Sequence, residues 1–203
     1  ILRGAFYHAG QVCVSIQKVI VHEDLVDEFL DLLKKSIKKL KVGNPSNIKT
    51  DVGPLIRPSE VKRIDSIVKK SIKEGAEIIC GGFSNKETTY ECTVIKNPKD
   101  KSEISQNEIF GPVLTIIPFD SEDEAISIAN DTPYGLAAYL QTGDPNRAMR
   151  IAGKLRAGAV HVNGGGYEYG SPFGGYKASG NGREGGKMGL EDYLETKVVH
   201  GIR

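Results

Sequence analysis

Hydrophobic residues recur along the chain with two different periods. Over residues 24–40 and 59–74, apolar side chains return every three or four positions, which is the spacing of one face of a helix. Gly75, directly after the second stretch, is a typical helix stop. Two shorter helices are indicated by start signals, a capping box at 121–124 and an Asp-Pro pair at 144–145. The pattern therefore predicts helices over 24–40 and 59–74, from Ser121, and from Asp144 to about Leu155.

Short β-rich runs lie between and after these helices. They cover residues 16–21, 76–80, 113–119, 136–141, 159–163 and 197–202. Strands that alternate with helices form βαβ units, whose strands are parallel. No internal repeat, low-complexity tract or long linker divides the chain. We therefore predict a single α/β domain, with an open, mostly parallel sheet flanked by helices on both faces.

The composition excludes several classes of protein. The 27 Lys and Arg residues balance 26 Asp and Glu, whereas a nucleic-acid groove needs a basic excess on one face. The longest uncharged apolar run, residues 110–119, is interrupted by glycine and proline and is too short to span a membrane. We expect no secretory signal, and the 3 cysteines are odd in number and far apart. These features predict a soluble, cytoplasmic protein with reduced thiols.

Two kinds of site are disfavoured by residue spacing. The four histidines are scattered and no C-x-x-C or H-E-x-x-H motif occurs, so we predict no metal site. Residues 180–185 match the G-x-G-x-x-G pattern, but no strand precedes them, as a dinucleotide-binding fingerprint requires. We interpret that segment as a loop.

Cys13 is the strongest candidate for chemistry. It lies between a short helical stretch and the first β-rich run, where backbone N–H dipoles can activate a thiolate without a neighbouring histidine. On spacing alone, a buried small hydrophobe is the alternative interpretation. For Cys80 and Cys92, inside or beside a β-rich run, that alternative is the one we adopt.

Residue identities add a family resemblance. Gly10-Gln11-Val12-Cys13 resembles the G-Q-x-C nucleophile segment of the aldehyde dehydrogenase superfamily. Further segments resemble that superfamily in the same order, at residues 42–45 with 51–56, 107–113, 129–136 and 172–184. The resemblance runs from about residue 4 to about residue 200.

The resemblance implies oxidation of an aldehyde to a carboxylic acid with NAD or NADP as cofactor. The cysteine thiolate attacks the aldehyde, a hydride passes to the cofactor, and water hydrolyses the resulting thioester. By this resemblance Cys13 is the nucleophile, and its backbone N–H forms half of an oxyanion hole. Glu108 accepts hydrogen bonds from the nicotinamide ribose, and Phe110 packs beside the nicotinamide ring.

Other residues receive weaker assignments from the same motifs. The aldehyde pocket would be lined by Val12, Val14 and Phe173, and by Tyr167 with the stretch 167–169. The tyrosines could equally be packing residues. Glu184 would assist proton movement, or else pair with Arg183 or a loop amide.

The chain also departs from the superfamily pattern. We find no E-L-G-G-K segment with its hydrolytic glutamate, and neither the asparagine of the oxyanion hole nor a dinucleotide-binding domain. Asn107 replaces the first glutamate of the E-E-I-F-G-P-V block. The chain therefore looks like the catalytic domain alone, over residues 1–195, followed by a C-terminal oligomerisation strand at 196–203.

The expected partners are a small-molecule aldehyde and further copies of the same chain, in a homodimer or homotetramer. Two alternatives remain open. One is the branch of the superfamily in which coenzyme A rather than water takes the acyl group. The other is a truncated, non-enzymatic chain that acts as an oligomerisation or binding module. The resemblance chooses neither the aldehyde nor NAD over NADP.

Overall fold

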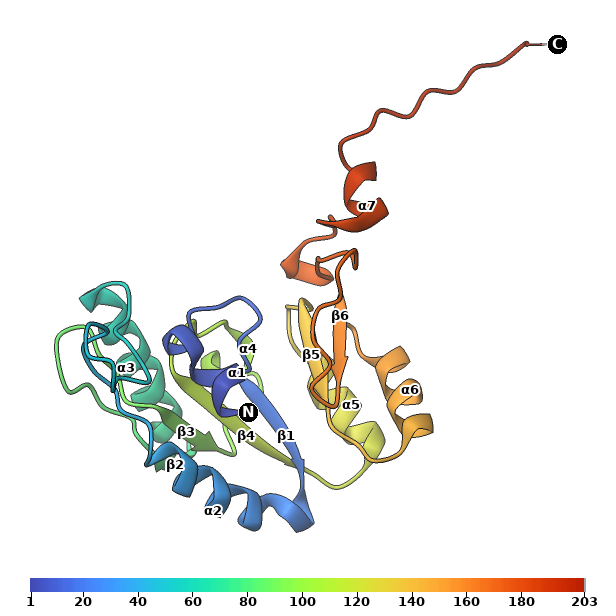
Figure 1. Ribbon diagram of the computed structural model, residues 1–203. Coiled ribbons are helices and arrows are strands. Elements are labelled where there is room, and N and C mark those ends of the chain that lie inside the picture. The colour runs from blue at the N-terminus through green and yellow to red at the C-terminus, as the bar shows by residue number, and fades with distance from the viewer. Residues whose placement is uncertain (203) are drawn as a thin grey trace. The chain divides into compact units, whose positions relative to one another are not determined.

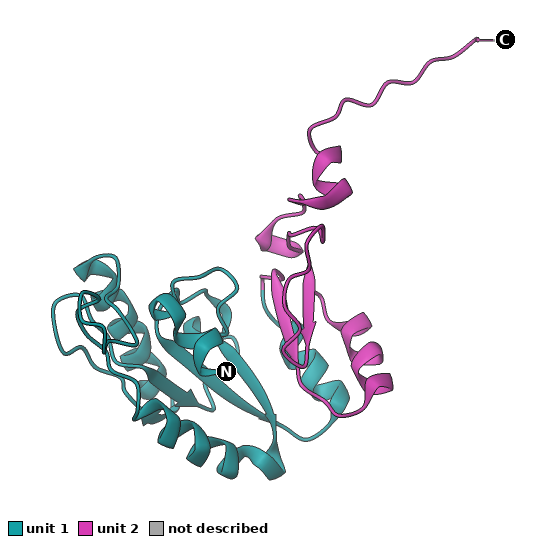
Figure 2. Ribbon diagram, viewed as in Figure 1, with its two compact units in different colours: residues 1–132 teal, residues 133–203 magenta. Residues whose placement is uncertain are grey.

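The computed structural model describes residues 1–202 and divides the chain into two compact units (Figure 2). Unit 1 is Ile1–Thr132, and unit 2 begins at Pro133. The prediction of one α/β catalytic domain over residues 1–195 stays a prediction. Helices and strands alternate on both sides of residue 132, which is why the local pattern carries no sign of the division. Each unit has a sheet of its own.

The sheet of unit 1 has the strand order β1-β4-β3-β2 (Figure 1). Its strands are β1 (Lys18–His22), β2 (Glu77–Cys80), β3 (Thr93–Lys96) and β4 (Val113–Phe119). β4 pairs in parallel with β1 and β3, and only β2 runs antiparallel to its neighbour. The predicted mostly parallel sheet is confirmed, while β3 is a strand that the sequence analysis did not predict.

Two long helices flank this sheet, as the apolar stripes predict (Figure 1). α2 (Val26–Ile37) follows a 3₁₀ turn, η2 (Glu23–Leu25), and buries its apolar stripe from Val26 to Ile37. α3 (Pro58–Lys73) ends before Gly75, whose φ of 102° is the left-handed conformation that glycine adopts readily. Both helices are confirmed: α2 lies a few residues inside the predicted 24–40, and α3 is shifted by one residue from the predicted 59–74.

The core of unit 1 lies around its central strand. In β4, residues from Val113 to Ile116 are buried, and Ile64 of α3 and Val94 of β3 are fully buried beside them in the same cluster. Burying an aliphatic side chain of this size contributes about 1.5–3 kcal/mol. Short helices complete the unit: α1 (Leu2–Phe6), η1 (Tyr7–Gly10) and α4 (Glu103–Gln106).

The predicted capping box begins α5 (Glu122–Asn130). The Ser121 hydroxyl accepts a hydrogen bond from the Glu124 N–H at 3.3 Å. The Glu124 carboxylate in turn accepts from the Asp120 N–H at 2.8 Å, one residue earlier than the box predicts. Both interactions satisfy backbone donors that have no partner within the helix.

Unit 2 contains one βαβ unit. β5 (Ala137–Leu140) and β6 (Ala159–Val162) pair in parallel, and α6 (Pro145–Lys154) connects them. Two short helices follow, η3 (Lys177–Ser179) and α7 (Gly186–Glu191). No helix among residues 1–202 has both the length and the apolar character needed to cross a membrane.

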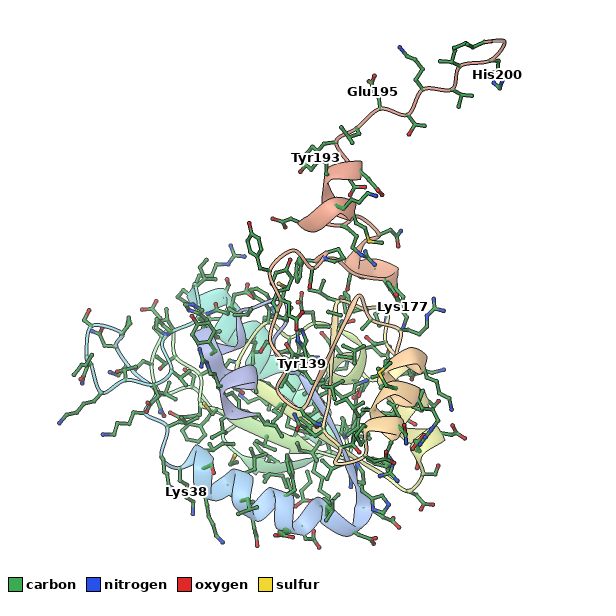
Figure 3. All side chains as sticks on the ribbon, turned by 45° about the vertical axis from the view of Figure 1, so that its right-hand side comes forward. Lys38, Tyr139, Lys177, Tyr193, Glu195 and His200 are labelled. Carbon is green, nitrogen blue, oxygen red and sulfur yellow. The ribbon has the colours of Figure 1, made fainter. Side chains whose placement is uncertain are left out.

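The C-terminal segment differs from its prediction. Residues 197–202 are exposed and form no strand, although the sequence predicts one there. A strand is stabilised by hydrogen bonds to a neighbouring strand, and no described segment pairs with these residues. Figure 3 shows Tyr193, Glu195 and His200 along residues 193–202, here called the C-terminal tail. The last residue of the predicted 196–203 segment lies outside the described residues.

Candidate functional site

Cys13 lies on an exposed turn between η1 and β1. The Ser15 N–H donates to the Val12 carbonyl at 2.9 Å and closes the turn. The Ser15 hydroxyl donates to the carbonyls of Gly4 and Ala5, at 3.1 and 3.2 Å, and ties the turn to α1. In this chain Cys13 is therefore a surface thiol on an anchored turn and not a buried core residue.

Glycine allows a close backbone contact just before this turn. Gly10 has a φ of 71°, and the two residues before it, His8 and Ala9, also have positive φ values of 50° and 56°. A Cβ at Gly10 would lie 2.1 Å from the carbonyl oxygen of Gly111. Only glycine permits such an approach, which brings the cysteine segment against the segment that carries Glu108 and Phe110.

Gln11 connects the cysteine segment to a second loop. Its side-chain amide donates to the Pro54 carbonyl at 3.3 Å and to the His8 carbonyl at 3.0 Å. Its side-chain oxygen accepts from the Ile56 N–H at 2.9 Å. The glutamine of the G-Q-x-C motif thus has a structural role here, because it ties the start of the cysteine turn to the loop at Pro54 and Ile56.

Cys13 shares a small hollow on unit 1 with residues of both segments. Its lining includes Gly10, Val12, Cys13, Gln17, Glu108 and Phe110. The hollow holds about 20 Å³ of free space, and one water needs about 10–15 Å³ by the same measure. A pocket that encloses a whole small molecule has about 300–1,000 Å³. The hollow therefore admits one small group beside the thiol.

The structure brings four of the sequence-predicted site residues to this hollow, namely Val12, Cys13, Glu108 and Phe110. Phe110 has a φ of 51°, which is uncommon for a bulky residue, and the residue is 43% exposed. No donor among residues 1–202 binds the Glu108 carboxylate, which is exposed. Val14 is half-buried in the same turn but does not line the hollow.

The remaining predicted residues belong to unit 2. Phe173 and Glu184 exchange two backbone hydrogen bonds of 2.7 Å, so their motif forms a tight loop. The Tyr167 hydroxyl donates to the Ser171 carbonyl, which satisfies it within the same loop region. Arg183 donates to the carbonyls of Gly175, Asn181 and Gly182. Within the described part of the chain, no ion pair joins Arg183 to Glu184.

The other two cysteines have different surroundings. Cys92 is buried in the core, and burial raises the pKa of its thiol to about 12. Burial also raises the pKa of Cys80, which is partly exposed at the end of β2. Both thiols therefore stay protonated near neutral pH and react poorly. This agrees with their interpretation as packing residues.

Two residues that bind the backbone around Glu108 were not predicted from the sequence, Gln17, which lines the hollow, and Arg63. The Gln17 side-chain amide donates to the Asn107 carbonyl at 2.8 Å, and its oxygen accepts from the Ile109 N–H at 2.7 Å. Arg63 of α3 donates to the Ile109 carbonyl at 2.5 Å. The only local signal in the sequence is a polar glutamine near the start of the β-rich run at residues 16–21.

Comparison with known proteins decides the family. The sequence model of the aldehyde dehydrogenase family matches residues 1–199. The chain belongs to the aldehyde dehydrogenase family. The match covers both units and includes every predicted site residue, and the resemblance found in the sequence is thereby confirmed at the level of the family.

Two curated relatives show how far the likeness to aldehyde dehydrogenases extends. A 3-succinoylsemialdehyde-pyridine dehydrogenase from Pseudomonas sp is 40% identical over 98% of this chain and 43% of its own length. A lactaldehyde dehydrogenase from Methanococcus maripaludis is 41% identical over 99% of this chain and 44% of its own length. This chain thus spans less than half the length of these aldehyde dehydrogenases.

A solved aldehyde dehydrogenase has the same fold as this chain. The betaine aldehyde dehydrogenase from Staphylococcus aureus, in complex with NAD⁺, is 40% identical with a TM-score of 0.90. The match covers 97% of this chain and 40% of that one. The α/β fold is therefore shared with an NAD⁺-binding member of the family.

Proposed function

We propose that this chain is the catalytic domain of an NAD(P)-dependent aldehyde dehydrogenase that oxidises an aldehyde to a carboxylic acid. The observation that carries the proposal is the hollow that Cys13 shares with Glu108 and Phe110. It places an exposed thiol, an unpaired carboxylate and an exposed aromatic ring side by side. The family membership supplies the reaction class in which such a set is used.

Cys13 supplies the nucleophile. Its thiolate attacks the carbonyl carbon of the aldehyde, a carbon–sulfur bond forms, and the carbonyl electron pair moves to the oxygen. The backbone N–H of Cys13 binds no acceptor among the described residues, so it is available to that oxygen as a hydrogen-bond donor. The space for a single small group beside the thiol suits the reacting oxygen.

Glu108 and Phe110 fit the nicotinamide half of the cofactor. A carboxylate without a donor can accept hydrogen bonds from two neighbouring ribose hydroxyls, and such charge-assisted bonds are the stronger kind. The exposed face of Phe110 offers a flat apolar surface to a ring. When bound, NAD⁺ or NADP⁺ accepts the hydride that the aldehyde carbon loses. Glu108 and Phe110 orient it, and they take no part in bond making.

The substrate is assigned only as an aldehyde. The three relatives above are named for a succinoylsemialdehyde-pyridine, lactaldehyde and betaine aldehyde, although their identities to this chain are all 40–41%. Identity at this level therefore does not choose among aldehydes. Val12 lines the hollow beside Cys13, and we assign it, with Val14 of the same turn, to the substrate side of the site. The roles of Tyr167 and Phe173, which belong to unit 2, stay predictions from the family resemblance.

The C-terminal tail supports an oligomeric assembly. Its apolar residues Leu194, Val198, Val199 and Ile202 are exposed. An extended segment with unpaired backbone groups and apolar side chains can add a strand to the sheet edge of another subunit. We therefore assign residues 196–203 to oligomerisation, in a homodimer or homotetramer.

The proposed function is tested in the full-length dehydrogenase, meaning a polypeptide that carries this chain together with the additional length of its relatives. Cys13→Ala should abolish aldehyde-dependent formation of NADH or NADPH, because the covalent intermediate cannot form. Cys80→Ala is the matched control and should retain activity. A Cys13→Ala activity within about tenfold of wild type, a difference of about 1.4 kcal/mol in the barrier, would contradict the proposal.

A further inference from the structure

We propose that Gln17 is a positioning residue for the cofactor site, which acts through the backbone on either side of Glu108. The proposal rests on the function proposed above. Gln17 lies directly before β1, four positions after Cys13. Its carboxamide bonds to the carbonyl of Asn107 and to the N–H of Ile109, the two residues that flank Glu108.

The chemistry of the amide explains why a glutamine suits this position. The Asn107 carbonyl needs a donor and the Ile109 N–H needs an acceptor, and a carboxamide offers both from one rigid plane. The same amide also reaches the Ile104 carbonyl of α4, at 3.4 Å. A single side chain therefore fixes the path of the chain from α4 to Ile109, with Glu108 as the residue in between.

Gln17 is itself held firmly. Its backbone carbonyl accepts from the Thr115 N–H at 2.8 Å and from the Thr115 hydroxyl at 3.0 Å. Thr115 is buried in β4, an inner strand of the sheet. Because the backbone of Gln17 is bonded to the sheet, its side-chain amide fixes residues 107–109 relative to the sheet.

Arg63 completes the arrangement from α3. It donates to the Ile109 carbonyl at 2.5 Å, and its Nε is held by Glu60 at 2.8 Å. The Arg63 guanidinium in turn lowers the pKa of Glu60. Both polar groups of the Ile109 backbone are therefore held by side chains from outside the segment, which fixes the backbone that leads into Phe110 and its positive φ.

The position of Gln17 gives this arrangement its functional meaning. Cys13 and Gln17 belong to the same short segment, and Ser15 between them is bonded to α1. The Cys13 thiol and the Gln17 side chain are thus carried by one anchored stretch of backbone, residues 13–17. A fixed separation between nucleophile and cofactor is what transfer between two bound reactants requires.

The test compares Gln17→Met with Gln106→Met in the full-length dehydrogenase. Methionine keeps the length of glutamine and removes its donor and its strong acceptor. Gln106 is a matched control, because its side chain donates to the Asp131 carbonyl and not to the Glu108 segment. By calorimetry, we expect the Kd for NAD⁺ to rise about tenfold in Gln17→Met, the effect of roughly one lost hydrogen bond, and to stay within about twofold in Gln106→Met.

A double-mutant cycle separates positioning from general destabilisation. If Gln17 acts through Glu108, adding Gln17→Met to Glu108→Gln should raise the Kd no more than about twofold beyond Glu108→Gln alone. Full additivity, or an unchanged Kd in Gln17→Met, would overturn the proposal. Failure of the proposed function has a different signature, since the wild-type protein would then bind neither NAD⁺ nor NADP⁺.

Hydrogen exchange gives a readout that is independent of cofactor and activity. In the 203-residue chain, the Ile109 amide should exchange about tenfold faster in Gln17→Met than in wild type, because its acceptor is lost. The Val94 amide in the core should be unaffected. Equal protection of Ile109 in both proteins would overturn the role given to Gln17.

Discussion

Gly10 and Gly111 meet backbone to backbone, with the carbonyl oxygen of Gly111 lying 2.1 Å from the place where a Gly10 Cβ would be. The contact joins the segment of the nucleophile to that of Glu108 and Phe110. It depends on two properties of glycine at once, the positive φ of 71° at Gly10 and the absence of a side chain.

Gly10→Ala should therefore destabilise the chain strongly. The methyl group meets backbone, which cannot move aside as a flexible side chain can, and alanine in addition disfavours a positive φ. We expect a loss of about 3 kcal/mol or more in the free energy of unfolding, measured by chemical denaturation. Gly53→Ala is the control, because a Cβ there has nothing within 4 Å. Similar stabilities for the two variants would show that the contact is looser than described.

Cys13 should be the first cysteine to react. Its thiol is exposed, whereas burial raises the pKa of Cys80 and Cys92 and disfavours their thiolates. Mass spectrometry after brief treatment with limiting iodoacetamide, at mildly alkaline pH, should find the label on Cys13. Earlier labelling of Cys80 or Cys92 would argue against Cys13 as the nucleophile.

The sequence predicted those parts of the fold that depend on local pattern. Most of the predicted β-rich runs are strands, and the caps at Ser121 and Asp144 hold their helices as expected. β3 (Thr93–Lys96) was missed although it is as long as β2, because its pairing with β2 on one side and β4 on the other is not visible in the local pattern. The predicted strand at 197–202 is not formed for the complementary reason, since a β-rich run becomes a strand only beside another strand.

The site shows the same division between local and distant information. The motif around Cys13 and the block around Glu108 were recognisable, and the hollow brings them together. Gln17 and Arg63 could not be recognised in the sequence, because both bind Ile109. That residue lies 92 positions from Gln17 and 46 positions from Arg63. No spacing rule reports such contacts. They follow from β4 pairing with β1 and from the face that α3 turns toward the sheet.

Asp144 makes the start of α6 dependent on pH. Its carboxylate accepts from the N–H groups of Arg147 and Asn146, and these bonds, that of Arg147 first, lower its pKa below the ordinary 3.8. A lowered carboxyl pKa stabilises the folded state above the ordinary pKa, and this contribution is lost as the pH falls through the lower folded value. In Asp144→Ala the Asn146 and Arg147 amides should exchange severalfold faster at neutral pH, and the difference from wild type should shrink in acid.

Asp144→Asn provides the control for the charge. Asparagine caps helices about as well as aspartate and cannot ionise, so the protection of the two amides should vary less with pH than in wild type. Hydrogen exchange is followed over the pH range in which circular dichroism still reports a folded chain. An Asp144→Ala effect of equal size at neutral and acid pH would show that the cap does not depend on the carboxylate charge.

The 203-residue chain by itself should bind nicotinamide cofactors very weakly and oxidise no aldehyde. Within the described residues, Glu108 and Phe110 are the cofactor contacts that we assign. Taken as a single charge-assisted interaction, the Glu108–ribose contact contributes about 1.5–3 kcal/mol net, and an aromatic contact adds about 0.5–1.5 kcal/mol, which together reach roughly 4 kcal/mol. That total corresponds to a Kd of about 1 mM before any cost of ordering is counted. Calorimetry with NAD⁺ and NADP⁺, together with an absorbance assay for NADH, measures both quantities. Micromolar binding or turnover by this chain alone would mean that it carries a cofactor site beyond the Glu108 segment.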